Sequence, residues 1–329
     1  MASADERPGE SRVRPGTQAL TLLSGPLNYS VLKALEDGPR PLVDLHRAVG
    51  SPPQTTMRVY LKRLVEMTAV ERIRQSDFPG AVEYELTKAG ENLMVVADIL
   101  QHWLQQAGDG PISLGTTGSR SAVKALVDGW STNLVRALAA RPLALAELNR
   151  FIPISSYPTL ERRLGAMNRA GLVEPHRTGG GRGTPYKVTD WLRRAIAPFT
   201  AAVGWEHRHV PHRAGPIGRS DVEATFLLIV PTLELSPEVN GHARLAVELR
   251  NAKETKYAGV SVQVQDGRVT SCVSRLEGEA DAWVNGTALG WFRWVNRGIK
   301  DAVEVGGDFE LAHGLADGIH SALIQADPI

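Results

Sequence analysis

The sequence predicts a chain of the α+β class, in which two copies of one helical unit precede a third, strand-rich region. Three observations support this prediction. The chain has 329 residues, enough for two or three domains, and a hydrophobic content of 43% that can fill several cores. Apolar positions recur after a shift of 103 residues. The pattern of apolar residues changes after residues 211–220, a linker rich in proline, glycine and arginine.

The internal repeat covers about residues 24–106 and 127–209. A shift of 103 aligns Leu35 with Leu138 and Leu61 with Leu164. Further along, the shift becomes 102, because the hairpin loop of the second copy has one residue fewer than that of the first. Loops tolerate such changes in length. The later pairs are Tyr84 with Tyr186, Thr87 with Thr189 and Trp103 with Trp205. Two copies of one supersecondary unit are therefore expected.

Each copy predicts the same elements in the same order. They are a first helix (28–38 and 130–140), a second helix from about Val43 or Ala144, a third helix (54–68 and 158–171), a two-stranded hairpin, and a long helix from about Thr87 or Asp190. Helical spacing in the third helix of copy one predicts a core face of Met57, Leu61, Leu64 and Val65. Its opposite face carries Thr55, Arg58, Val59 and Lys62.

The glycine-rich segment 179–183 admits two interpretations. A phosphate-binding loop needs Gly-Lys-Ser/Thr before a helix, whereas Thr184-Pro185 and the alternating Tyr186 and Val188 follow here. A strand after the glycines favours the tip of a β-hairpin. Three helices followed by a two-stranded wing form a winged helix-turn-helix.

Residues 24–104 resemble the HxlR-type winged-helix regulators. The resemblance rests on the apolar second helix, the segment LKRLVEMTAVER, and the Tyr-x-Leu-Thr-x-x-Gly run from Tyr84 to Gly90. The second copy keeps Tyr186 and Thr189 but has Arg193 in place of the glycine. The resemblance implies a dimer that binds a two-fold operator, so one chain with two copies would form a pseudo-dimer on DNA.

The candidate DNA-binding residues lie on the third helices and the wings. In copy one they are Gln54, Thr55, Thr56, Arg58, Lys62, Arg63, Arg72 and Arg74. In copy two they are Ser155, Ser156, Tyr157, Thr159, Arg162, Arg163, Arg177 and Arg182. Copy two has Glu161 and Gly165 where copy one has Arg58 and Lys62, so copy one is expected to contact bases and copy two mainly phosphates. A solvated helix face is the alternative for each arginine.

Charge is distributed unevenly along the chain. Residues 108–214 carry 15 Lys and Arg against 7 Asp and Glu, while residues 215–329 carry 10 against 16. A basic middle region suits a polyanionic partner, and an acidic last third does not.

The last third predicts a compact α+β domain. Strands are expected at 222–235, 242–250, 257–267 and 268–277, with a hairpin turn at Asp266-Gly267, then a strand and helix over 281–298 and a final helix within 303–324. The segments ADAWVNGTALGWFRWVNRG and VEVGGDFELAHGL are similar to the sterol-carrier-protein type 2 domain. This resemblance implies an apolar tunnel for a hydrophobic molecule. Four aromatic residues are candidates for lining it, or else are ordinary core: Trp283, Trp291, Phe292 and Trp294.

The sequence favours a DNA-binding transcriptional regulator, with repression expected, whose partners are double-stranded operator DNA and a small hydrophobic or aromatic ligand. The alternatives are a protein that sequesters a metabolite on a winged-helix scaffold, and an enzyme, although no catalytic constellation, cofactor motif or metal site is evident. The expected divisions are an arm at 1–20, winged helices at 21–110 and 120–212, and a ligand domain at 219–329. No apolar run suggests a signal peptide or membrane span, so a cytoplasmic protein is expected, and further homodimerisation stays open.

Overall fold

The computed structural model describes residues 14–74, 82–152, 155–176, 183–250, 254–298 and 302–324. These residues form a mixed helical and sheet structure, which confirms the α+β class. The chain divides into two compact units. The amino-terminal unit comprises Pro15–Val127 and Ala197–Ala214, and the carboxy-terminal unit comprises Met1–Arg14, Asp128–Ile196 and Gly215–Ile329.

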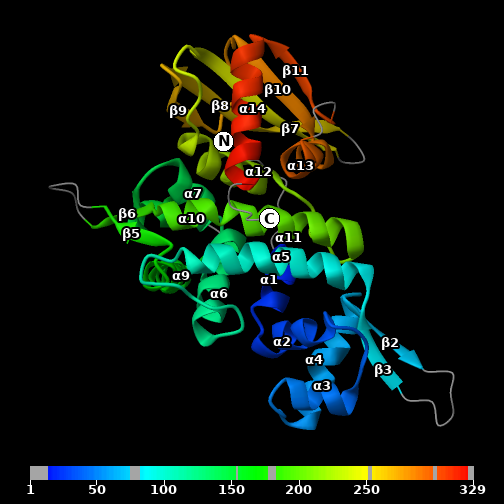
Figure 1. Cartoon of the computed structure of the whole chain (residues 1–329). Helices are drawn as coiled ribbons and strands as arrows, with labels where there is room; N and C mark the ends of the chain where they lie inside the picture. Colours follow the sequence, from blue (N-terminus) through cyan, green and yellow to red (C-terminus); the bar gives the residue numbers. More distant parts are fainter. Residues whose placement is uncertain are drawn as a thin grey trace. The chain divides into compact units, whose positions relative to one another are not determined.

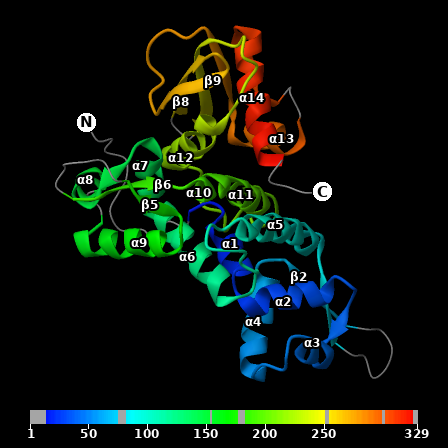
Figure 2. The same cartoon turned by 60° about the vertical axis from the view of Figure 1, so that its left-hand side comes forward.

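The amino-terminal unit contains the elements of a winged helix. In order they are α1 (Thr17–Leu23), α2 (Pro26–Leu35), β1 (Arg40–Pro41), α3 (Leu42–Ala48), α4 (Gln54–Glu66), β2 (Val70–Arg74), β3 (Val82–Leu86) and α5 (Lys88–Gln105). The three strands pair in the order β1-β3-β2. Both views show β2 and β3 extending away from α2, α3 and α4 (Figure 1, Figure 2). The expected arm 1–20 overlaps α1, because residues 17–20 are already helical.

Helix α4 buries one stripe of its surface. Met57, Leu61 and Leu64 face the core, as their spacing predicts. The prediction that Val65 belongs to this face is wrong, because its side chain is exposed. Val65 follows Leu64 directly, and one residue turns the side chain by about 100° around the helix.

Gly90 explains the most specific part of the repeated motif. A Cβ atom at Gly90 would lie 2.0 Å from the carbonyl oxygen of Ala69, so α5 approaches the end of α4 more closely than any other residue permits. Thr87 caps α5 by accepting a hydrogen bond from the Gly90 amide at 3.1 Å. The hairpin and α5 are thereby fixed to the helical body.

Helix α11 (Ile196–His209) is the last part of the second copy in sequence, but its residues from Ala197 onward belong to the amino-terminal unit. Trp205 donates its indole N–H to the Ala89 carbonyl at 2.8 Å. Glu206 is buried and accepts the backbone amides of Gly16 and Ala19, each at 2.8 Å. Burial raises the pKa of Glu206, and the amide hydrogen bonds partly oppose that shift.

The carboxy-terminal unit repeats the order of the first set of elements. These are α7 (Leu134–Ala140), β4 (Leu143–Ala144), α8 (Leu145–Phe151), α9 (Tyr157–Arg169), β5 (Val173–Pro175), β6 (Pro185–Val188) and α10 (Asp190–Arg194). The preceding helix, α6 (Thr117–Ser131), belongs to the amino-terminal unit up to Val127. The strands pair in the order β4-β6-β5, which matches β1-β3-β2.

The segment predicted as a strand at 222–235 is instead helical, as α12 (Arg219–Ile229) followed by a short 3-10 helix, η1 (Val230–Thr232). Nearly every residue from Asp221 to Ile229 is buried, because α12 packs against both α7 and β8. A helix covered on opposite sides is apolar around its circumference. It therefore lacks the amphipathic period that separates a helix from a buried strand.

Polar contacts fix α12 to the preceding elements of its unit. Glu223 is buried and pairs with Arg136 of α7 and with Arg219. Asp221 accepts the indole N–H of Trp130 at 2.8 Å. The expectation that Arg193 stands where the first copy has Gly90 is wrong, because Leu192 is the counterpart: its amide donates to the Thr189 hydroxyl at 3.2 Å, as the Gly90 amide does to Thr87. Arg193 is the next residue, and it donates to the carbonyl oxygens of Leu227 and Leu228 and so attaches α10 to α12.

The last part of the chain forms a five-stranded sheet. It contains β7 (Gly241–Arg250), β8 (Thr255–Gln265), β9 (Arg268–Val273), β10 (Ala282–Thr287) and β11 (Glu304–Gly307), in the order β11-β10-β7-β8-β9. Strand β10 runs parallel to β7, so the chain crosses the sheet between β9 and β10. The turn at Asp266-Gly267 has positive φ at both residues, as the hairpin prediction requires. Helices α13 (Ala288–Arg297) and α14 (Phe309–Ile324) pack on the sheet and on each other.

Candidate nucleic-acid interface

Helix α4 presents a polar face to solvent. The side chains of Gln54, Thr55, Arg58 and Lys62 are exposed, and they recur every three or four residues along one side of the helix. Arg63 is exposed beside them, and Thr56 is half-buried. Long donors on a free helix face can reach base edges in a major groove, where arginine and lysine bind guanine.

Strand β2 adds two cations to this surface. Arg72 and Arg74 are exposed, and alternation along the strand puts them on the same face of the β2–β3 hairpin, opposite Tyr84 and Val82. Strand β2 contacts α4, so these two exposed cations belong to the same domain as the polar face of the helix. Arginines at a wing contact phosphates and set the register of a protein on DNA.

The sequence-based set omitted three residues that the fold places here. Val59 is 65% exposed on α4, between Arg58 and Lys62. Gln18 and Arg213 join α4 around a hollow of about 420 Å³. The Arg213 guanidinium lies 4.0 Å from Glu66, and Gln18 donates to the Arg213 carbonyl.

Of these three residues, only Val59 could have been placed on this surface from the sequence. The outward position of Val59 follows from helical spacing, and an apolar side chain there can contact the methyl group of thymine. Arg213 lies far from α4 in sequence, and the docking of α11 brings it near. Its charge offsets Glu66, the one carboxylate on the exposed face of α4 among the residues described.

Helix α9 of the second copy has a different surface. Ser156, Tyr157 and Arg162 are exposed, but Glu161 is exposed among them. The hydroxyls of Ser156 and Thr159 lie 2.9 Å apart. Ser155 and Arg163 are half-buried, and the Arg163 Nε has no hydrogen-bond partner within the described ranges. The predicted wing arginines Arg177 and Arg182 lie outside the described residues.

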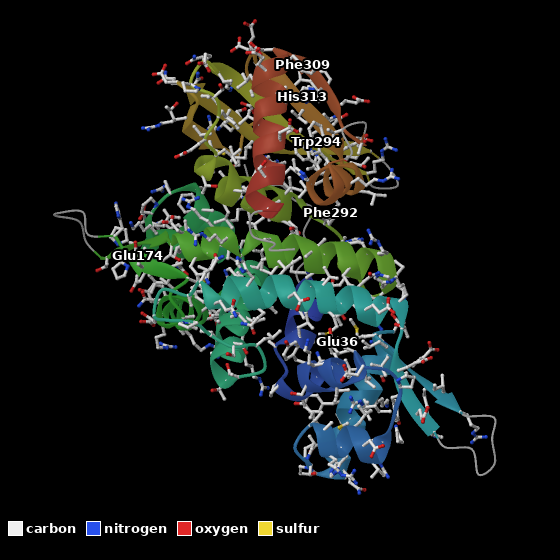
Figure 3. All side chains as sticks on the ribbon, in the orientation of Figure 1. Glu36, Glu174, Phe292, Trp294, Phe309 and His313 are labelled. Carbon is white, nitrogen blue, oxygen red and sulfur yellow. The ribbon has the colours of Figure 1, made fainter. Side chains whose placement is uncertain are left out.

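The four aromatic candidates of the last domain do not gather in one place. Trp291 donates to the Ala246 carbonyl at 2.8 Å, and its ring meets Phe226 of α12 edge to face. Trp294 is 1% exposed, and the centre of its ring lies 5.8 Å from that of His313 on α14 (Figure 3). Trp283 is 41% exposed on β10, where its neighbours Ala282 and Val284 are buried. Strand alternation therefore puts Trp283 on the other face of the sheet.

Phe292 is half-buried on α13, between the two buried tryptophans in sequence. The packing of Trp291 and Trp294 is that of core residues between sheet and helices.

In the described part of the chain, no group of three or more His, Cys, Asp or Glu side chains could hold a metal ion. No described helix has the length and apolarity needed to cross a bilayer.

Three helices, the third of which exposes a polar face, and a cationic hairpin define a winged helix-turn-helix domain in the amino-terminal unit. Residues 22–110 match the family of HxlR-like helix-turn-helix domains. The match covers this domain and supports a winged-helix, DNA-binding transcriptional regulator.

A crystal structure assigned to a transcriptional regulator of the MarR family from Enterococcus faecalis V583 is also similar to this chain. It shares 24% sequence identity, with a TM-score of 0.25, over 30% of this chain and 90% of that chain. The comparison with curated proteins gave no match.

Proposed function

We propose that this protein represses transcription, releasing its operator when the carboxy-terminal unit binds a small molecule. The observation that carries the proposal is the exposed face of α4, where Gln54, Thr55, Arg58 and Lys62 stand beside Arg72 and Arg74 of the wing. No interaction inside the described chain occupies Arg58. A free arginine on this face is suited to binding DNA.

The two sets of winged-helix elements act together as a pseudo-dimer on a two-part operator. The repeated strand order and helix order support this arrangement. Helix α4 contacts bases, and α9 contributes contacts to the sugar-phosphate backbone through Arg162 and its neighbouring hydroxyls. Binding two half-sites from one chain raises affinity, because the second contact becomes intramolecular.

Ligand response requires a connection between the sheet domain and the second set of winged-helix elements. Helix α12 supplies it, since Glu223 and Asp221 attach it to α7 and to Trp130. A ligand that binds one arrangement of α12 more tightly than another changes the position of α9. A shift from 1% to 99% of one state needs about 5.5 kcal/mol of differential binding.

The decisive experiment selects a DNA sequence from a random pool and measures its affinity by fluorescence anisotropy over a range of salt concentrations. Arg58→Ala should weaken binding by about 1–3 kcal/mol and relax base preference at one position. Lys62→Ala should weaken binding and lower the salt dependence by about one phosphate contact if it binds the backbone. Lys33→Ala, on α2, is the matched control.

The proposal fails if the selected DNA binds no more tightly than random DNA, or if Arg58→Ala leaves affinity unchanged. The sequestering alternative predicts ligand binding without any salt-dependent binding to DNA. It would be favoured by quenching of tryptophan fluorescence in a protein that selects no DNA sequence.

A further inference from the structure

A groove of about 900 Å³ opens in the last domain, away from the tryptophans. One wall is the segment 232–239, which follows α12 and η1, and the other is one side of α14. Leu233 and Val239 are buried beneath it, and Leu235 is half-buried. The base of the groove is therefore apolar, as small-molecule sites commonly are.

The side of α14 that faces the groove carries small and acidic residues. Spacing of three and four residues puts them on one face: Glu310, Gly314, Asp317, Gly318 and Ser321. A Cβ atom at Gly314 would lie 3.8 Å from Leu235, which is ordinary contact. Glycine in the middle of a helix is less favourable than alanine. Packing does not require it at this position, so its effect is to keep the groove open.

The groove lies apart from the aromatic cluster. His313 of α14 contacts Trp294 and Phe309, and the His320 ring bonds to the Val295 carbonyl of α13. These contacts occupy the side of α14 that faces α13. The side toward residues 232–239 is left to the groove, and none of the four aromatic candidates lines it.

The rim of the groove is acidic. Its carboxylates are Glu234, Glu238, Glu310 and Asp317, and no lysine or arginine of the described ranges lines it. The Ser236 hydroxyl donates to Glu238 at 2.6 Å and lowers the pKa of that carboxyl. An anionic rim around an apolar base favours a ligand with a positive charge and an apolar body, and it repels an anion.

We propose that this groove binds a small organic cation with an apolar body, of the lipophilic ammonium or phosphonium type. The inference rests on the proposed ligand-binding role of the carboxy-terminal unit and names the chemistry of that ligand. A neutral or acidic lipid does not fit, because its binding would bury part of a carboxylate rim without compensation. The groove begins at Thr232, the last residue of η1, so its occupant contacts the segment that continues from α12.

The test compares two probes of the same shape and opposite charge. Isothermal titration of the full chain, without DNA, measures binding of tetraphenylphosphonium and of tetraphenylborate. We expect the phosphonium to bind at one site per chain and to weaken as salt is added, while the borate does not bind there. Equal affinity for the two ions would overturn the assignment.

Two sets of variants locate the site. Neutralising Glu234 and Glu310 together, as Glu234→Gln with Glu310→Gln, should weaken phosphonium binding about fivefold to tenfold at low salt, since two attractive charges are removed from the rim. The matched control replaces two exposed carboxylates outside the groove, as Glu277→Gln with Glu304→Gln, and should change nothing. Gly314→Leu places a side chain in the groove and should abolish binding.

The result for the groove is separable from the result for the proposed function. Phosphonium binding that is lost in Gly314→Leu supports the groove even if affinity for DNA does not respond to it. Unchanged binding in both groove variants overturns the groove assignment, and the regulator can still respond to another molecule elsewhere. A lysine-rich peptide that binds the natural protein but not Gly314→Leu, when the phosphonium binds neither, would assign the groove to a protein partner and overturn the small-molecule proposal.

Discussion

At the scale of single residues, the DNA-binding face of α4 combines donors with one apolar side chain. Arg58 and Lys62 supply charge, and Val59 stands exposed between them. An exposed β-branched residue in a helix adds little to stability, because it buries no apolar surface and restricts its own rotamers. Its position beside two cations suits direct contact with a thymine methyl group.

Replacing thymine by deoxyuridine in the selected DNA tests this role of Val59. The substitution removes one methyl group and leaves base pairing unchanged. At the contacted position we expect affinity to fall by about 1 kcal/mol for the natural protein. Val59→Ala should bind both DNA sequences equally. A Val59→Ala protein that still prefers thymine to the same extent would contradict the assignment.

The cations of α4 and β2 could be placed from sequence because helical and strand periods fix which side faces outward. Arg72 and Arg74 are exposed as predicted from the hairpin. Arg213 could not be found this way, because it reaches α4 only after α11 has docked, 195 residues beyond Gln18. Periodicity reports local geometry and carries no information on contacts between distant segments.

At the scale of elements, the motif that ends at Gly90 fixes α5 to the rest of its unit. The Thr87 hydroxyl caps the helix by accepting the Gly90 amide, and the close approach to Ala69 depends on the absence of a side chain at Gly90. The second copy has Leu192 in place of the glycine, so it lacks this approach. The guanidinium of the next residue, Arg193, donates to two carbonyl oxygens of α12 instead.

Gly90→Ala should destabilise the amino-terminal unit by about 1–3 kcal/mol, as other overpacked sites do. A Cβ atom 2.0 Å from a backbone carbonyl oxygen forces the helix to move. Gly204→Ala is a matched control in α11, where a Cβ atom meets nothing within 4 Å. It should leave stability unchanged or raise it by up to about 1 kcal/mol. Urea denaturation measures both, and equal stability of the two variants would refute the packing argument.

A second prediction at this scale concerns Asp221 on α12. Burial raises the pKa of this carboxyl, and Arg14 and the Gly218 amide partly oppose the shift. The folded state therefore holds the proton more tightly than the unfolded state. Its contribution to stability is complete below the ordinary aspartate pKa and is lost as pH rises through the raised value.

Denaturation of the natural protein and of Asp221→Asn should be compared from about pH 4 to pH 7, the window above the ordinary aspartate pKa. Across this window the unfolding free energy of the natural protein should fall as pH rises, and that of the variant should fall by less. Because Glu206 has a raised pKa as well, some decrease remains in the variant. Identical pH dependence would mean that Asp221 has the same proton affinity in both states.

The elements of the sheet could be predicted from sequence, whereas α12 could not. In strands β7 and β8 the buried apolar side chains alternate along the chain, as the period of a strand predicts. Helix α12 is buried on opposite sides, and its apolar run has no period.

The tryptophans were predicted to line one site because they are close in sequence. Strand alternation at Trp283 and the turn of α13 send them to different surroundings.

At the scale of the whole molecule, the units do not follow the repeats. The amino-terminal unit includes residues 197–214, which form the end of the second copy of the repeat and the few residues after it. Glu206 and Trp205 make its long-range hydrogen bonds. A fragment cut at the boundary suggested by the repeat loses these partners.

Fragments spanning 14–110 and 14–214 should therefore differ in stability. The shorter one leaves the Ala89 carbonyl and the Gly16 and Ala19 amides without their partners, and each unsatisfied buried group costs about 1–3 kcal/mol. We expect the shorter fragment to unfold at lower urea concentration and to be cleaved faster by protease. Equal midpoints would show that α11 adds nothing to the first domain.

The same chain path has a consequence for synthesis of the protein. When the first winged helix has emerged from the ribosome, α11, which completes its unit, has not yet been synthesised. At roughly 5–20 residues per second, the nascent chain waits several seconds for α11 to emerge. During that interval the surface around Ala89 is open to chaperones, and a translational pause before residue 197 would lengthen the exposure.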